Sequence, residues 1–185
     1  MRNRLRALRR GDGLEICAPP DFDSLFRACV ADVHAYAMSM LGDRAAAEDV
    51  TALAFERLYR ARRRLDPRRG TARGLLFTIA RNAALDELRR RARRAPAQQD
   101  PGQVPDSRAD AALSQVEHRA LVADALAALG ARDRELVLLK FHGQLSNGEL
   151  ARVLGISESN VGTRLHRALM RLRTRCLELE RETAA

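Results

Sequence analysis

A proline-rich segment near the middle of the chain is the feature that most constrains its fold. Residues 96–110 read PAQQDPGQVPDSRAD, with three prolines, one glycine and no aromatic residue. This composition is typical of an extended linker and cannot build a packed core. On both sides of it, apolar residues recur at helical spacing, and no stretch alternates as a strand would. The sequence therefore predicts an all-α protein, with two small helical domains joined by a flexible linker.

Composition supports this fold class and narrows the kind of protein. Hydrophobic residues make up 46 % of the 185 residues but aromatic residues only 4 %, a balance that favours helix over sheet. No apolar run approaches the roughly 18 residues of a membrane span, so a soluble, cytoplasmic protein without membrane contact is expected. The three cysteines lie far apart, with no CxxC pair and no zinc-ligand spacing. We expect reduced thiols, no metal and no cofactor.

The first block, about residues 21–95, follows a basic tail at residues 1–20 that is expected to be disordered. Its periodicity predicts one helix from Phe22 to Leu41 and a second that begins near Arg44. After a turn at 66–71, a third helix is expected from Ala72 to Arg94. The residues predicted on the buried face of this third helix are Leu75, Leu76, Ile79 and Ala83.

The second block, about residues 111–178, begins with a helix that Gly130 ends, and a tail is expected at 179–185. Asp133 is expected to cap the next helix. The apolar residues expected on that helix are Leu136, Val137, Leu139 and Phe141.

Residues 145–173 carry the most informative motif of the chain. Ser146 and Glu149 have the spacing of a capping box, Gly155 supplies a turn, and Ser157 is placed to cap a second short helix. Together these signals predict a helix-turn-helix whose second helix reads DNA. The residues expected to bury that helix are Val161, Leu165, Ala168 and Leu172.

Helical geometry of about 100° per residue fixes which side chains of the second helix face outward. They are hydrogen-bond donors with little acidic charge, which suits a major groove and its phosphates. A structural helical hairpin with a solvated basic face is the alternative. The residues predicted to read DNA are Ser159, Asn160, Thr163, Arg164, His166 and Arg167.

Arginine supplies almost all of the basic charge, with 32 arginines, a single lysine and a formal net charge of +9. A genome biased toward arginine codons and selection for phosphate contacts both explain this total. Arginines gather at residues 68–73 and at residues 89–94, before and at the end of the third predicted helix. These two clusters indicate either a solvated face or a track for phosphates.

In this order, the two blocks resemble an extracytoplasmic-function (ECF) sigma factor of bacterial RNA polymerase over about residues 22–178. The matching segments in the first block are LGDRAAAEDV at 41–50, LDPRRGT at 65–71 and FTIARN at 77–82. In the second block the matching segments are residues 145–158, which begin with LS and end with GISE, and RLHRA at 164–168. The resemblance implies that block 21–95 is sigma region 2 and that block 111–178 is sigma region 4.

The resemblance also implies partners and residue roles. Core RNA polymerase, promoter DNA and an anti-sigma factor are the implied partners. The residues that would bind polymerase are Glu48, Asp49, Val50, Leu53 and Phe55. Those that would engage the −10 element are Arg68, Arg69, Thr71, Arg73, Thr78, Arg81, Asn82, Asp86 and Arg89. The helix-turn-helix would read the −35 element.

Two other classes of function stay open from the sequence alone. A stand-alone helix-turn-helix regulator would use the same second helix, but as a dimer on a palindromic site. A helical scaffold would owe its arginines to codon bias and would show no salt-sensitive DNA binding. Catalysis is not expected, because the sequence holds no phosphate-cradling glycine loop, metal cluster or triad-like constellation.

Overall fold

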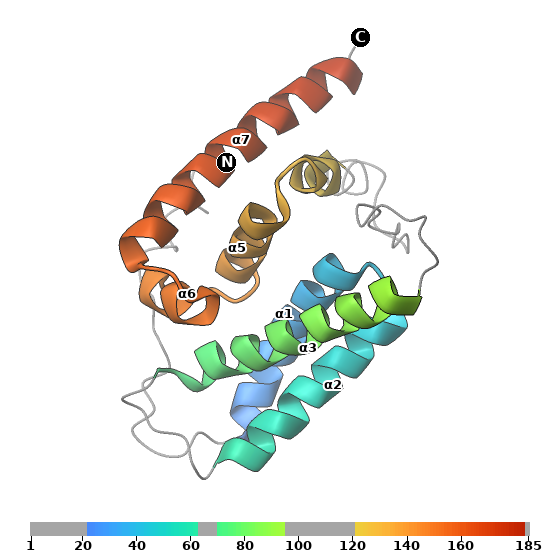
Figure 1. Ribbon diagram of the computed structural model, residues 1–185, viewed down its shortest axis with the longest axis vertical. Helices are drawn as coiled ribbons and strands as arrows, with labels where there is room; N and C mark the ends of the chain where they lie inside the picture. Colours follow the sequence, from blue (N-terminus) through green and yellow to red (C-terminus); the bar gives the residue numbers. More distant parts are fainter. Residues whose placement is uncertain (1–21, 63–69, 95–120, 184–185) are drawn as a thin grey trace.

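The computed structural model describes residues 22–62, 70–94 and 121–183, and the regular structure of these residues is entirely helical (Figure 1). The all-α prediction is thus confirmed. The N-terminal block consists of α1 (Phe22–Leu41), α2 (Arg44–Ala61) and α3 (Ala72–Arg94). The C-terminal block consists of helical residues 121–127, α5 (Ala131–Phe141), α6 (Asn147–Leu154) and α7 (Glu158–Thr183). The predicted tail 1–20 and linker 96–110 lie outside the described residues.

Local signals set the ends of the helices. Gly42 has a φ of 62°, a left-handed conformation that favours glycine, and it ends α1. The Asp43 carboxylate accepts a hydrogen bond of 3.0 Å from the backbone N–H of Ala46 and caps α2. The predicted bounds of the first and third helices and the predicted start of the second are confirmed. None of the helices in the described ranges is long and apolar enough to cross a membrane.

An aromatic pair lies at the centre of the N-terminal block. Tyr36 of α1 and Phe77 of α3 are both fully buried, and their rings meet edge to face with centroids 5.8 Å apart. Leu76 and Ala83 are buried as predicted, whereas the other two residues of the predicted face are only partly buried. The sequence prediction missed Phe77 because the buried face of α3 is wider than one stripe.

Phe77→Ala is expected to lower the free energy of unfolding by about 3–5 kcal/mol, because it removes a fully buried ring from a packed site. Phe77→Leu keeps much of the volume and is expected to cost less than half as much. Urea unfolding followed by circular dichroism measures both values. Equal stability of Phe77→Ala and the wild type would show that this ring is not part of the core.

The two blocks share one buried apolar cluster, which the sequence analysis did not predict. The cluster runs from Leu76 and Phe77 of α3 to Leu136 of α5 and Leu150 of α6 without a break. Figure 1 shows α5 and α6 on the side of α3 that faces away from α2. The described parts of the two predicted domains therefore pack against each other.

Three details of the C-terminal block differ from the sequence prediction. Gly130, not Asp133, is the N-cap of α5, and no side chain donates or accepts a capping hydrogen bond there. Asp133 lies in the first turn of the helix instead. Phe141 is the last residue of α5 and is 60 % exposed, because the helix ends where its apolar face meets solvent. The second helix of the motif, α7, is not short: it has 26 residues and continues past residue 178, where a tail was expected.

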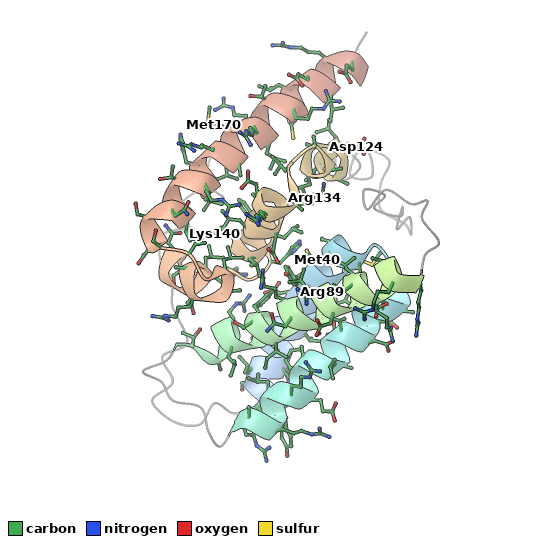
Figure 2. All side chains as sticks on the ribbon, viewed as in Figure 1. Met40, Arg89, Asp124, Arg134, Lys140 and Met170 are labelled. Atoms are coloured by element: carbon green, nitrogen blue, oxygen red, sulfur yellow. The ribbon has the colours of Figure 1, made fainter. Side chains whose placement is uncertain are left out.

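The two cations labelled on α5 in Figure 2 serve the C-terminal block itself. Arg134 donates hydrogen bonds to the carbonyls of Leu126, Ala127 and Leu129, which end the preceding helix. The Lys140 ammonium donates to the carbonyl of Leu145, 2.9 Å away, ahead of α6. The Arg134 bonds hold the preceding helix to α5, and the Lys140 bond holds the start of the helix-turn-helix to it.

Candidate functional site

The helix-turn-helix is built from the capping groups that the sequence predicted. The Ser146 hydroxyl accepts from the backbone N–H of Glu149, and the Glu149 carboxylate accepts from that of Ser146. Gly155 is left-handed with a φ of 67° and makes the turn. The Ser157 hydroxyl then accepts a bond of 3.2 Å from the backbone N–H of Asn160, at the start of α7.

Packing fixes the rotation of α7. Val161 and Ala168 are fully buried, while Leu165 and Leu172 are partly buried and packed against the same apolar clusters. The opposite face is exposed and includes Met170, which points away from the block in Figure 2. Five of the six residues predicted to read DNA are exposed on this face: Ser159, Asn160, Thr163, His166 and Arg167.

Arg164 is the exception, because it holds α7 against α5. Its Nε and Nη2 atoms lie 3.2 and 2.7 Å from Oδ1 of Asp133, and the two side chains are only 25 % and 21 % exposed. Arg171 lies 3.5 Å from the other carboxylate oxygen of Asp133. In this structure the Arg164 guanidinium is therefore engaged within the C-terminal block.

Arg164→Ala is expected to lower the free energy of unfolding by about 1–3 kcal/mol, because it removes a charged hydrogen bond and leaves Asp133 half-buried beside only the more distant Arg171. Urea unfolding of the full chain measures this loss. The control is Arg175→Ala, which removes only ion pairs within α7 and is expected to stay within about 0.5 kcal/mol of wild type. If both variants unfold at the same urea concentration, the Arg164–Asp133 pair does not stabilise the block.

The residues predicted to engage the −10 element fall into two groups. Thr71, Arg73 and Arg81 contact the C-terminal block or the α1 helix and are partly buried. Thr78 is partly buried and donates a hydrogen bond to the carbonyl of Gly74 in its own helix. The remaining described residues are exposed, namely Asn82, Asp86 and Arg89, the last two forming an ion pair of 2.9 Å. Arg68 and Arg69 lie outside the described residues.

Arg81 of α3 makes a bidentate ion pair with a carboxylate of the C-terminal block. Its Nε atom lies 2.8 Å from Oε1 of Glu135 on α5, and its Nη2 atom lies 3.3 Å from Oε2. The side chains are 22 % and 10 % exposed. Sequence reasoning missed this contact, although an acidic residue directly before the apolar run 136–139 was a signal that it needed a buried partner.

Arg73 and Thr71 add two further contacts across the blocks. The Arg73 guanidinium donates to the carbonyl of Gly143, 2.6 Å away, and also forms an ion pair of 2.5 Å with Asp32 of α1. The Thr71 hydroxyl donates to Glu149, the carboxylate that also caps α6. Burial raises the pKa of Glu149, but hydrogen bonds from Thr71 and Ser146 outweigh this effect, so that its pKa lies below the usual range.

A groove of about 400 Å³ separates α2 from α3 and contains part of the predicted polymerase surface. Asp49 and Leu53 line it, and Glu48 is exposed and pairs with Arg44 outside it. The side chains that line it are Ala46, Asp49, Val50, Leu53 and Arg57 of α2 and Ala83, Asp86, Glu87, Arg90 and Arg93 of α3. The groove thus combines an apolar floor with charges of both signs at its edges.

Phe55 does not share this surface. It is only 4 % exposed, and its ring packs edge to face with Phe22 and Phe26 of α1, at centroid distances of 6.3 and 4.8 Å. Val50, at 5 % exposure, is also mostly covered but reaches the groove floor.

Among the described residues, no group of three or more His, Cys, Asp or Glu side chains could hold a metal ion.

Comparisons with known proteins agree with both blocks. The Sigma-70 region 2 family matches residues 25–94, and the Sigma-70 region 4 family matches residues 119–172. The ECF RNA polymerase sigma factor SigL of Mycobacterium tuberculosis is 35 % identical over 145 residues, which cover 78 % of this chain and 82 % of SigL.

Two solved structures share the fold. CnrH, in complex with the cytosolic domain of CnrY, is 26 % identical with a TM-score of 0.59, covering 83 % of this chain and 85 % of CnrH. RpoE of Bartonella quintana, in complex with the anti-sigma factor NepR, is 21 % identical with a TM-score of 0.63. The match covers 84 % of this chain and 96 % of RpoE. With the two family matches and the identity to SigL, these findings show that the chain belongs to the ECF sigma factors of RNA polymerase.

Proposed function

We propose that this sigma factor reads the −35 element with the exposed face of α7. The observation that carries this assignment is the rotation of α7, in which Val161 and Ala168 are buried and Thr163, His166 and Arg167 face outward. Polar and basic side chains near the N-terminal end of the second helix are positioned for base edges and phosphates in a major groove. The engagement of Arg164 with Asp133 makes Arg167 the principal charged donor of that face.

The groove between α2 and α3 is proposed as the surface that binds core RNA polymerase. It offers Leu53 as an apolar contact, with Asp49 and Arg57 beside it as charged contacts. Glu48 extends the charged surface along α2. Buried Phe55 supports this surface from inside rather than contacting the partner. An apolar centre with a polar rim is the usual anatomy of such an interface.

Region 2 is proposed to engage the −10 element through α3 and the arginines that precede it. Asn82 and Arg89 are exposed on α3, whereas Arg73 and Arg81 become available only if their present partners release them. Arginine is suited to this role because its planar guanidinium binds phosphate in two places. No enzymatic step is proposed for the chain.

We also propose an anti-sigma factor as a partner and the cytoplasm as the site of action. The support is the resemblance of the sequence to ECF sigma factors and the structural likeness to CnrH, which forms a complex with the cytosolic domain of another protein. Which surface an anti-sigma factor would cover is tested by competition with core polymerase for the α2–α3 groove.

Reconstituted transcription tests the proposed function directly. Purified chain is added to core RNA polymerase on fragmented DNA of the source genome, and transcript starts are mapped. We expect new starts that share upstream elements and that core polymerase alone does not make. A chain that binds a palindromic site as a dimer, without core polymerase and without new starts, would instead act as a stand-alone regulator.

A further inference from the structure

The first residue of α7 is an exposed glutamate, Glu158. It is the only acidic residue in the stretch 158–177, which also contains five arginines. The N-terminal end of the second helix of a helix-turn-helix is the part that comes closest to base edges. DNA phosphates repel a carboxylate in this place, so it weakens binding to every sequence unless a hydrogen-bond donor on the DNA pairs with it.

The Glu158 carboxylate has its acceptor atoms free. In the part of the chain that the structure describes, no ion pair or hydrogen bond involves this side chain. The positions three and four residues further along α7, where a cation of the same helix could pair with it, are Val161 and Gly162. The carboxylate lies against Gly148 of α6 instead, with Oε2 3.6 Å from the place that a Cβ atom of that residue would take.

The chemistry of base edges decides which base suits such a group. An ionised carboxylate only accepts hydrogen bonds, and the major groove offers it two donors, the N4 amino group of cytosine and the N6 amino group of adenine. Adenine carries the acceptor N7 beside its amino group, and that lone pair repels the second carboxylate oxygen. Guanine and thymine present acceptors and a methyl group there. Cytosine is therefore the base that a carboxylate fits best.

On the basis of the proposed reading of the −35 element by α7, we propose that Glu158 is a specificity-determining residue whose carboxylate accepts a hydrogen bond from the N4 amino group of a cytosine in that element. Any other base at this position leaves the carboxylate unpaired beside acceptors and phosphates. Discrimination thus comes from repulsion of the wrong base as well as from attraction of the right one.

A structural role is the competing explanation for Glu158. An acidic residue in the first turn stabilises a helix through the dipole of its N-terminus. This effect acts on the free protein, and it changes the affinity for all promoter sequences by the same factor. Base preference at a single position therefore separates the two roles.

Glu158→Gln tests the proposal, because it keeps the shape of the side chain but replaces the carboxylate with a carboxamide, which pairs with N6 and N7 of adenine. The matched control is Glu178→Gln, which makes the same change of charge near the other end of α7, where Glu178 pairs with Arg175. Each variant is assembled with core RNA polymerase. Its affinity is measured for a promoter found by mapping transcript starts, with every base of the −35 element varied in turn. Urea unfolding of each free chain measures its stability.

We expect the wild-type and Glu178→Gln holoenzymes to prefer cytosine at one position by about tenfold, the scale of a single base contact. Glu158→Gln is expected to prefer adenine at that position and to keep the wild-type preference at all others. Glu158→Ala is expected to show no preference there. It should also bind promoters that lack the cytosine more tightly than wild type does, because the repulsion of phosphates is gone.

Two results would overturn the proposal. One is a Glu158→Gln holoenzyme with wild-type base preference at every position; a lower stability in urea would then leave Glu158 with a structural role alone. The other is a wild-type holoenzyme that prefers cytosine at no position of the −35 element. In both cases a wild-type preference for some −35 sequences over others leaves the proposed function intact. If the wild-type holoenzyme distinguishes no −35 sequences at all, the proposed reading of this element by α7 fails as well.

Discussion

Leu53→Asp is expected to weaken binding to core RNA polymerase more than about thirtyfold. Leu53 is a partly buried residue of the α2–α3 groove, and a carboxylate there would lose its water when a partner covers it. Loss of a hot-spot contact of this kind costs about 2 kcal/mol or more, which corresponds to about a thirtyfold increase in the dissociation constant. Titration of fluorescent sigma factor with core polymerase measures it, and circular dichroism checks that helix content is unchanged.

Ala52→Asp is the matched control for this variant. Ala52 is exposed on α2 and is not among the residues that line the groove, so the same new charge is expected to leave polymerase binding within about twofold of wild type, the usual scale of surface substitutions away from an interface. Phe55→Asp is expected to unfold the N-terminal block instead, because it places a carboxylate against the packed rings of Phe22 and Phe26. Equal polymerase affinities for Leu53→Asp and Ala52→Asp would place the interface elsewhere.

Arg167→Ala is expected to weaken promoter binding by the holoenzyme by about 1–3 kcal/mol, a factor of roughly five to 150. Arg167 is exposed on the outward face of α7, and nothing in its helix packing depends on it. If the lost contact is to a base, preference at one position of the −35 element relaxes. If the lost contact is to a phosphate, the holoenzyme binds all promoter sequences more weakly by about the same factor. The slope of log affinity against log salt concentration then falls by about one.

The measurement is promoter affinity at several salt concentrations, with the −35 element varied base by base. Arg175→Ala serves as the control, because Arg175 lies further along α7 and pairs with Glu178 and Glu182. It is expected to change neither the salt slope nor the base preference. An Arg167→Ala holoenzyme that matches wild type in affinity, salt slope and base preference would show that this face of α7 does not read the promoter.

Features governed by neighbouring residues could be predicted from the sequence. The end of the first helix at Leu41, the start of the second near Arg44 and the Ser146–Glu149 capping box each depend on a few adjacent positions, and the structure confirms them. The buried stripe of α7 follows from helical spacing alone. Val161 and Ala168 are fully buried, as that spacing predicted.

Contacts between distant residues could not be predicted in this way. Arg81 and Glu135 are 54 positions apart, and each shows only a polar side chain on a helix when read alone. Arg164 was predicted on the DNA-reading face because helical spacing places it at the edge, and only the position of Asp133 on another helix decides its direction. Phe55 was assigned to the polymerase surface through the resemblance, whereas its aromatic partners lie on α1.

The length of α7 has a mechanical consequence. Its 26 residues span about 39 Å at 1.5 Å per residue, and Figure 1 shows its C-terminal end extending away from α5 and α6. Leu172 is the last residue of α7 in the apolar cluster with Val137 and Ala168, and residues 173–183 continue the helix for about 16 Å beyond it. A tilt of α7 by about 10° about Leu172 displaces its C-terminal end by about 3 Å, because that end lies about 16 Å from this residue. A spin label at Arg181 would therefore report how region 4 is oriented before and after polymerase and DNA engage it.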